Sequence, residues 1–241
     1  MGKIRLATSF GIREESIDRI KDIKTPIQLG MFHSSVFNNL RFTSSEELRR
    51  NKIEVAVVHL PIDCYKLTPF EIFEIMNYYK DQHGVKKFVV HPNYGVENFI
   101  HEFSIRTPVY ELCVENFQWR RKKPLRTPLN IHDVCKGTEN IRMAFDTSHA
   151  EDIWFDKKIF SYLIDMISVI HLSNRTGKIK HKPFNCMDGD INLVSFVRDL
   201  QREYDWSGDL VLEYSRDYKY KLSENIAYLK KILGIEEDYE T

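Results

Sequence analysis

The sequence predicts an α/β protein that folds as a single (β/α)8 barrel over residues 1–241. Short, β-branched apolar runs alternate with segments of helical periodicity, which is typical of a parallel sheet covered by helices. Eight such runs in 241 residues correspond to about 30 residues per repeat, the size of one βα unit. The first run is followed by one glycine, Gly11, rather than by a glycine-rich phosphate loop. The alternative, an open doubly wound sheet, is therefore less favoured.

The expected strands are runs rich in Val, Ile and Leu that are bounded by polar residues, glycine or proline. Apolar residues at nearly every position indicate strands that are buried on both faces. In chain order the runs are Ile4–Phe10, Ile27–Phe32, Ile53–Leu60, Lys87–His91, Val109–Glu115, Ile141–Asp146, Ser168–Leu172 and Leu210–Glu213.

The expected helices lie between these runs. Thr68–Lys80 opens with Thr-Pro-Phe-Glu, a capping box with proline at the first helical position. We expect Asp190 to cap a helix over Ile191–Tyr204, and Ser223 to cap the last helix. The other expected segments are Glu14–Ile23, Ser44–Asn51, Gly95–Phe103, Leu129–Lys136 and Ser161–Ile167, the last being the apolar end of a further helix.

The composition excludes several classes of protein. A hydrophobic content of 42%, with 15 Phe and 12 Tyr, excludes a disordered chain, and a net charge of zero argues against coating nucleic acid through bulk charge. The four cysteines form no C-x-x-C pair, which indicates a reducing compartment without a disulfide framework. Neither a signal-peptide pattern nor an apolar run of the ~20 residues that span a bilayer is present. We therefore expect a cytoplasmic protein without a membrane partner.

Six expected strands have, as their last or second-to-last residue, a residue that binds metals in proteins. These residues are His59, His91, Glu115, Asp146, His171 and Glu213. The carboxyl ends of barrel strands meet on one face, where active sites are built, so these side chains should converge. His149 and His181 follow two of the strands and should join them. Each residue alone has an ordinary explanation as a cap or a salt-bridge partner, and the metal hypothesis depends on the joint pattern.

The last four strands supply the predicted metal ligands, Glu115, Asp146, His171 and Glu213. Three carboxylates and one imidazole form a mostly oxygen donor set that suits Mn²⁺, Mg²⁺ or Co²⁺, with Zn²⁺ also compatible. A buried carboxylate needs a partner, and a divalent cation satisfies carboxylates and imidazoles together. The remaining histidines would bind additional metal or contact substrate: His59, His91, His149 and His181.

The ordered series of motifs resembles the xylose isomerase-like TIM barrels over about residues 55–215. The motifs are HLP at 59–61, VVHPN at 89–93, VEN at 114–116, DTSHA at 146–150, HLSN at 171–174, DGDIN at 188–192 and LEYS at 212–215. That group contains sugar and sugar-phosphate isomerases and epimerases, and also apurinic-site nucleases of the endonuclease IV type. The resemblance implies a barrel that binds one to three divalent metals. Glu115, Asp146, His171 and Glu213 match the metal ligands that the epimerase branch and the nuclease branch of the group share.

The same resemblance separates the two branches at other positions. His149 matches a substrate contact of the epimerases and a zinc ligand of the nucleases, and His59 and His91 match nuclease ligands. The chain departs from the pattern before His181, where Ile179 and Lys180 stand in place of a common aspartate. Asn174 likewise stands where an acidic residue is frequent. Because a third zinc would lose a carboxylate, the isomerase or epimerase branch is favoured.

The expected function is a divalent-metal-dependent sugar or sugar-phosphate isomerase or epimerase that transfers a proton through a metal-stabilised enediolate. Glu115 and Glu213 are the predicted catalytic base and acid. Arg175 and Lys178 are predicted to bind substrate or its phosphate, the alternative being solvated loop residues.

Two other functions are retained. A zinc-dependent endonuclease would use the same cluster, with DNA as its partner, and the basic runs Trp119–Lys123 with Arg126 and 175–182 fit an anionic substrate of either kind. A barrel that binds a ligand without converting it is the third alternative. Related barrels often form homo-oligomers, which is compatible with this sequence.

Overall fold

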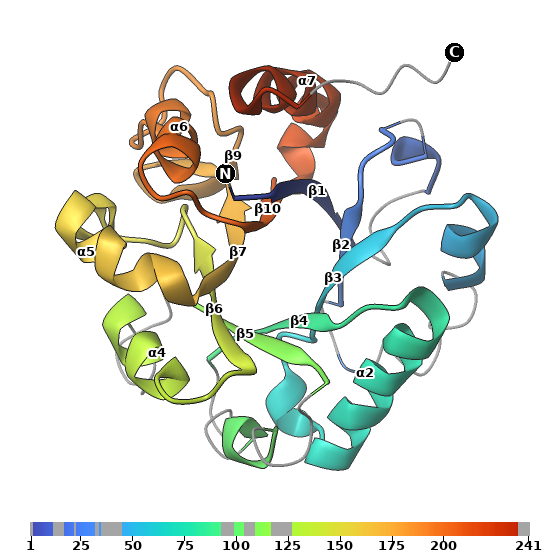
Figure 1. The fold of residues 1–241 in the computed structure, drawn as a ribbon. Coiled ribbons are helices and arrows are strands. Elements are labelled where there is room, and N and C mark those ends of the chain that lie inside the picture. The colour runs from blue at the N-terminus through green and yellow to red at the C-terminus, as the bar shows by residue number, and fades with distance from the viewer. Residues whose placement is uncertain are drawn as a thin grey trace.

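A computed structural model describes residues 2–11, 17–21, 23–31, 34, 45–92, 99–103, 109–116 and 127–235. In this part of the chain, eight parallel strands form a closed barrel, and the helices surround it (Figure 1). The strand order around the barrel is β1-β10-β7-β6-β5-β4-β3-β2. Consecutive strands of the barrel are therefore neighbours throughout, and the predicted (β/α)8 fold is confirmed.

The barrel strands agree with the predicted runs to within a few residues. They are β1 (Ile4–Gly11), β2 (Ile27–Gly30), β3 (Val55–His59), β4 (Lys87–Val90), β5 (Glu111–Glu115), β6 (Ile141–Asp146), β7 (Ile167–Leu172) and β10 (Gly208–Leu212). Because β4 and β10 end one residue earlier than predicted, His91 and Glu213 stand just beyond their strands.

The helices fill the intervals between strands. They are α2 (Pro69–His83), α4 (Pro128–Cys135), α5 (Lys157–Leu163), α6 (Leu193–Arg202) and α7 (Leu222–Leu233), with further helical residues at 45–50 and 99–103. Short 3₁₀ helices are η1 (Ile17–Arg19), η2 (Cys64–Lys66), η3 (Asp152–Phe155), η4 (Ile164–Met166) and η5 (Arg216–Lys221). The predicted capping box of α2 is present in full, and Gly84 ends this helix in the left-handed region at φ 69°.

Two predicted helix caps are wrong. Asn192 caps α6 by accepting a hydrogen bond from Ser195 N at 3.2 Å. The carboxylate of Asp190 instead accepts from Gly177 N at 2.8 Å, in the preceding loop. Ser223 lies inside the first turn of α7, because η5 continues into this helix without the extended residue that a side-chain cap requires.

One element that the sequence did not predict follows β7. β8 (Asn174–Thr176) and β9 (Ile179–Lys182) form an antiparallel hairpin, which places His181 on a strand rather than in a loop. Other predicted features lie outside the described residues: 14–16 and 22 of one helix, 95–98 of another, and the basic run Trp119–Lys123 with Arg126.

The barrel interior is layered, because alternate residues of each strand face inward. The middle layer is small and apolar and consists of Ala7, Ala56, Val57, Val89, Cys113, Ala144, Val169 and Val211. Toward the amino ends of the strands lies a charged layer, formed by Arg5, Lys87, Glu111 and Asp209. The polar residues of the candidate site form the layer at the carboxyl ends. A larger apolar core lies between the barrel and its helices.

No helix in the described part of the chain combines the length and the apolar character that crossing a bilayer requires.

Candidate active site

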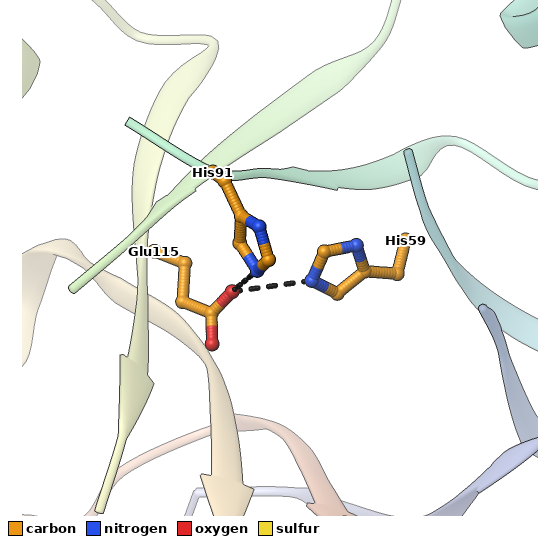
Figure 2. Close-up of side chains that lie close together, drawn as sticks. All are labelled: His59, His91 and Glu115. Carbon is orange, nitrogen blue, oxygen red and sulfur yellow. Dashed lines mark hydrogen bonds and ion pairs between the residues drawn. The ribbon is translucent and has the colours of Figure 1, made fainter. Parts of the chain in front are cut away.

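Glu115, the last residue of β5, is the centre of the site and is 1% exposed. Its Oε2 lies 2.7 Å from His91 Nε2 and 3.1 Å from His59 Nε2, so both imidazoles point at one oxygen (Figure 2). Its Oε1 lies 3.2 Å from His171 Nδ1 and 3.7 Å from His149 Nδ1. Burial favours the neutral acid, but the surrounding histidines outweigh this effect and hold the pKa of Glu115 well below its usual range.

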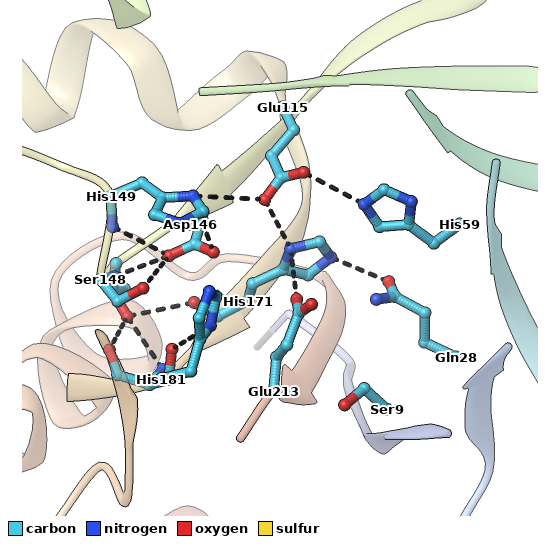
Figure 3. Close-up of polar contacts among 12 residues, drawn as sticks. Ser9, Gln28, His59, Glu115, Asp146, Ser148, His149, His171, His181 and Glu213 are labelled. Carbon is cyan, nitrogen blue, oxygen red and sulfur yellow. Dashed lines mark hydrogen bonds and ion pairs between the residues drawn. The ribbon is translucent and has the colours of Figure 1, made fainter. Parts of the chain in front are cut away.

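Glu213 shares its imidazole partner with Glu115. Glu213 Oε2 lies 2.8 Å from His171 Nδ1, the same nitrogen that faces Glu115 (Figure 3). Burial lowers the pKa of His171, but the two carboxylates raise it well above 6.5. Burial likewise raises the pKa of Glu213, and the charge of His171 brings it far below 4.5. Two carboxylates therefore compete for one nitrogen atom.

Asp146 is completely buried at the end of β6, and its two oxygens differ in their contacts. Oδ1 accepts hydrogen bonds from Ser148 N at 2.7 Å, Ser148 Oγ at 2.9 Å and His149 N at 3.0 Å. Oδ2 accepts no hydrogen bond from the residues that the structure describes, and faces His149 Nδ1 at 3.2 Å. The turn after β6 thus fixes the carboxylate and leaves one buried oxygen directed at the cluster.

Asn116, the last residue of the VEN motif at 114–116, has a structural role beside Glu115. Its Nδ2 donates to the Asp146 carbonyl at 2.9 Å, and its Oδ1 accepts from Asp146 N at 2.6 Å. This pair of hydrogen bonds joins the ends of β5 and β6, and so fixes Asp146 relative to Glu115.

The orientation of the histidines tests whether a metal fits. His59 Nδ1 donates to the Leu60 carbonyl at 2.9 Å, and His171 Nε2 donates to Gln28 Oε1 at 2.8 Å. In a neutral imidazole the other nitrogen then carries a lone pair, which here faces carboxylates that cannot donate. The inner nitrogens therefore need either a proton or a cation. An outer hydrogen bond of this kind is the usual second-sphere arrangement of metal-binding histidines, so the residues fit a divalent metal.

Three groups of donor atoms have the spacing of a metal site, with all atoms of a group within 4.8 Å of one another. The groups are Glu115, Asp146, His171 and Glu213; His59, His91 and Glu115; and Asp146, His149 and His181. The first is the quartet that the sequence predicted, and the structure brings its four members together. The other two contain all four of the additional histidines.

The third group differs from the second in the charge beside it. Each of the two shares its carboxylate with the first group, through Glu115 in the second group and Asp146 in the third. Lys180, next to His181, is half-buried near Asp146. Burial lowers the pKa of Lys180, and the nearby guanidinium of Arg175 lowers it further, whereas Asp146 acts in the opposite direction. A third metal ion would therefore meet few negative charges and a neighbouring lysine.

A cavity of about 330 Å³ opens above the cluster at the carboxyl ends of the strands. Of the predicted site residues, six line it: His59, His91, Glu115, His149, His181 and Glu213. Asp146 and His171 are completely buried behind this lining. The cavity therefore exposes two carboxylates, Glu115 and Glu213, to a ligand.

Arg175 and Lys178, the predicted substrate or phosphate contacts, are not among the residues that line the cavity. The Arg175 guanidinium donates to the Ala150 carbonyl and to Asp152 Oδ1, the latter at 2.5 Å. Lys178 is exposed in the turn of the β8–β9 hairpin. The cations that line the cavity are instead Arg216 and Lys219.

Sequence reasoning missed several residues of the site. Gln28 is 1% exposed on β2 and orients His171, and Ser9 lines the cavity from β1. Their signal in the sequence is a polar residue at an inward position of an otherwise apolar strand. Arg216 and Lys219 carry no such signal, because charged residues in a loop are ordinary.

Comparison with known proteins places the chain among barrels of one family. The sequence model of the xylose isomerase-like TIM barrel matches residues 105–232, which is more than half of the chain. No curated protein matches the sequence significantly.

Solved structures with the same fold include two that are named for epimerases and one that is named for an endonuclease. A D-tagatose 3-epimerase-like protein superposes with a TM-score of 0.70 at 18% identity, over 95% of this chain and 98% of that chain. The 3-keto-D-glucoside 4-epimerase from E. coli gives 0.68 at 10% identity, over 95% and 100%. Endonuclease IV from Thermus thermophilus gives 0.64 at 14% identity, over 95% and 99%. At these identities the likeness shows the fold alone.

Proposed function

The chain belongs to the xylose isomerase-like TIM barrel family, and from that premise we propose that it is a divalent-metal-dependent isomerase or epimerase of sugars or sugar phosphates. The observation that carries the proposal is the pair Glu115 and Glu213. Both carboxylates line one cavity, and both contact His171 Nδ1, at 3.2 and 2.8 Å.

Both groups of this pair are in the ionised form, which is the form that accepts a proton. The pKa values of Glu115 and Glu213 are held below their usual range by the histidines, so both groups are ionised at neutral pH and can accept a proton. Glu213 retains 24% side-chain exposure, whereas Glu115 has 2%. Glu213 can therefore exchange its proton with water in the cavity, and Glu115 is shielded.

The metal would be held by Glu115, Asp146, His171 and Glu213. When bound, it would supply a Lewis acid that polarises the substrate carbonyl and acidifies the adjacent C–H bond. One carboxylate removes that proton and leaves an enediolate. Return of the proton to the neighbouring carbon gives an isomer, and delivery by the second carboxylate to the opposite face gives an epimer.

The size of the cavity supports a small substrate. A volume of about 330 Å³ is at the lower end of the range for small-molecule sites. The imidazoles of His149 and His181 line it and can hydrogen-bond to sugar hydroxyls.

Solvent deuterium exchange tests the proposal. The protein, loaded with Mn²⁺, Co²⁺, Mg²⁺ or Zn²⁺ in turn, is incubated in D₂O with a panel of ketoses and ketose phosphates, and incorporation at carbon is followed by NMR. We expect incorporation into at least one compound, and its loss on chelation. If no compound of the panel incorporates deuterium with any metal, the isomerase proposal is wrong.

A second candidate, an endonuclease IV-like phosphodiesterase, is suggested by the three donor groups around Glu115 and Asp146. The half-buried Lys180 beside the third group weighs against it. Incubation with a duplex that contains an abasic site distinguishes the two, and metal-dependent incision together with three zinc ions per chain would favour the nuclease.

A further inference from the structure

Two cations line the cavity without belonging to the donor cluster. Arg216 and Lys219 lie in η5, the 3₁₀ helix that begins three residues after Glu213. In a 3₁₀ helix, side chains at positions i and i+3 lie one above the other, because there are three residues per turn. The two cationic side chains therefore share the face of η5 that borders the cavity.

Lys219 is held in place at this border. Its Nζ donates to the Ser9 carbonyl at 2.7 Å and to Ser9 Oγ at 3.1 Å. Ser9 also lines the cavity, at the carboxyl end of β1. The ammonium group is thus fixed over β1, the neighbour of β10 from which Glu213 follows.

Arg216 differs from Arg175, the arginine that the sequence favoured as an anion contact. The guanidinium of Arg175 is engaged by Ala150 and Asp152, whereas Arg216 is exposed and has no hydrogen bond or ion pair with any residue that the structure describes. A planar guanidinium offers several donors in the geometry that a phosphate or carboxylate accepts. Arg216 is therefore available to an anion in the cavity.

The position of the two cations relative to the cluster is also informative. Asp146 ends β6 and His149 follows it, and β6 is three strands from β1 in the barrel. In Figure 3, Ser9 lies on the side of Gln28 and Glu213, away from Asp146 and His149. A ligand whose reacting carbon lies between Glu115 and Glu213 would extend its other end toward Ser9, Arg216 and Lys219.

We infer that Arg216 and Lys219 form an anion-binding subsite, and that the substrate carries a phosphate or carboxylate at the end remote from its reacting carbon. This inference deepens the proposed function and rests on it for the identity of the reacting carbon. The shared chemistry is a terminal oxyanion that accepts charge-assisted hydrogen bonds from Arg216 and Lys219.

The first experiment measures binding and does not depend on turnover. Inorganic phosphate is titrated into the protein by calorimetry, with and without Mn²⁺. We expect Arg216→Gln and Lys219→Gln each to weaken phosphate binding by about tenfold or more, and Arg216→Lys to retain part of the affinity. The matched controls are Arg202→Gln and Lys231→Gln, exposed residues of α6 and α7, which should bind phosphate as the wild type does.

The second experiment identifies the source of the anion. Deuterium incorporation is compared for D-fructose, D-fructose 6-phosphate and D-fructuronate, which share a carbon skeleton and differ in the terminal group. We expect a preference for an anionic member, with the better of the two identifying phosphate or carboxylate. Arg216→Gln should lower kcat/KM for that compound by about tenfold or more, a larger loss than the same variant causes for D-fructose.

The outcomes separate the inference from the proposed function. Wild-type phosphate affinity in both Gln variants, or no phosphate binding by the wild type, would overturn the subsite even if a sugar is converted. Loss of phosphate binding in the variants without deuterium incorporation from any sugar supports the subsite and rejects the isomerase. Circular dichroism of Arg216→Gln shows that the fold is intact.

Discussion

The two ends of the barrel interior both contain buried charges, and they satisfy them in different ways. At the amino ends of the strands, Asp209 is 1% exposed and pairs with both Arg5 and Lys87, whose Nζ lies 2.7 Å from Oδ2. Burial opposes the charge of Lys87, but neighbouring anionic groups raise its pKa above 10.5. The cations of this end are therefore permanent at any ordinary pH.

At the carboxyl ends, the same strands present carboxylates to histidines. Glu115 and Glu213 have no lysine or arginine ion pair among the described residues and depend on imidazoles, which are positive only when protonated. A proton on His171 can be replaced by a metal ion, whereas the charge of Lys87 cannot be replaced. The comparison teaches that the barrel pairs its buried carboxylates with permanent cations at the amino ends of the strands and with exchangeable ones at the candidate site.

The largest expected effect is on deuterium exchange, and it distinguishes two glutamates at opposite ends of β5. Glu115→Gln should lower deuterium exchange by about 10²–10⁴-fold, because an amide accepts no proton. Glu111→Gln, at the opposite end of β5, should retain exchange, since the Glu111 side chain contacts Ser168, Cys113 and Lys87 rather than the donor cluster. Equal losses in the two variants would remove the distinction between the ends.

The next largest effect is on the free energy of unfolding, where a carboxylate at each end of the barrel is neutralised. Asp209→Asn should lower the free energy of unfolding by about 3 kcal/mol, because Lys87 loses the charge of a buried partner, while the 41% exposed Arg5 contributes less. Glu213→Gln should change the stability of the metal-free protein much less, since His171 can lose its proton. Urea unfolding in the presence of a chelator measures both, and a larger loss for Glu213→Gln would contradict the comparison.

A smaller effect is expected at the outer nitrogen of His171. Gln28→Leu removes the acceptor that orients this ring and should weaken Mn²⁺ binding by about tenfold to a hundredfold. Gln201→Leu is the control, because Gln201 donates to the Leu233 carbonyl away from the site. Competition with a metal-binding dye measures both affinities, and unchanged Mn²⁺ affinity in Gln28→Leu would exclude this orienting role.

The smallest expected effect is a pH dependence of stability, which arises from the ionisable groups at the carboxyl ends of the strands. The pKa values of Glu115 and Glu213 lie below 4.5, so their contribution to stability is present above pH 4.5 and is lost as the pH falls through the lowered values. The pKa of His171 lies well above 6.5, so its contribution is complete below pH 6.5 and is lost as the pH rises through the raised value. His59 and His149 shift in the same direction as His171, and His91 in the opposite one.

The metal-free protein should therefore show its highest Tm between about pH 4.5 and 6.5, with a decline above this range that Mn²⁺ abolishes. The groups at the amino ends of the strands add no decline there, because the pKa values of Arg5 and Lys87 are raised above their usual values. A Tm of the chelated protein that rises steadily above pH 6.5 would contradict this assignment.

Much of the fold could be predicted from the sequence because the signals are local. The apolar runs located all eight barrel strands, and the residue at each strand end identified the quartet that the structure brings together. The hairpin β8–β9 escaped prediction because its strands, of three and four residues, are polar and depend on a turn at Gly177, φ 56°. The cap of α6 was misplaced because Asp190 is two residues from Asn192, and only the hairpin determines which of them is free to cap.

The sequence by itself determined where each barrel strand lies along the chain and which polar residues stand at or next to its carboxyl end, because short apolar runs bounded by polar residues are a local signal. Only the tertiary structure decided the partners. Gln28 reaches His171 across 143 residues, and Glu115 collects imidazoles from three other strands and a turn. Likewise Arg216 and Lys219, rather than Arg175 and Lys178, border the cavity. The physical reason is that barrel closure and loop conformation set these distances, and neither is encoded in the residues next to the ones that meet.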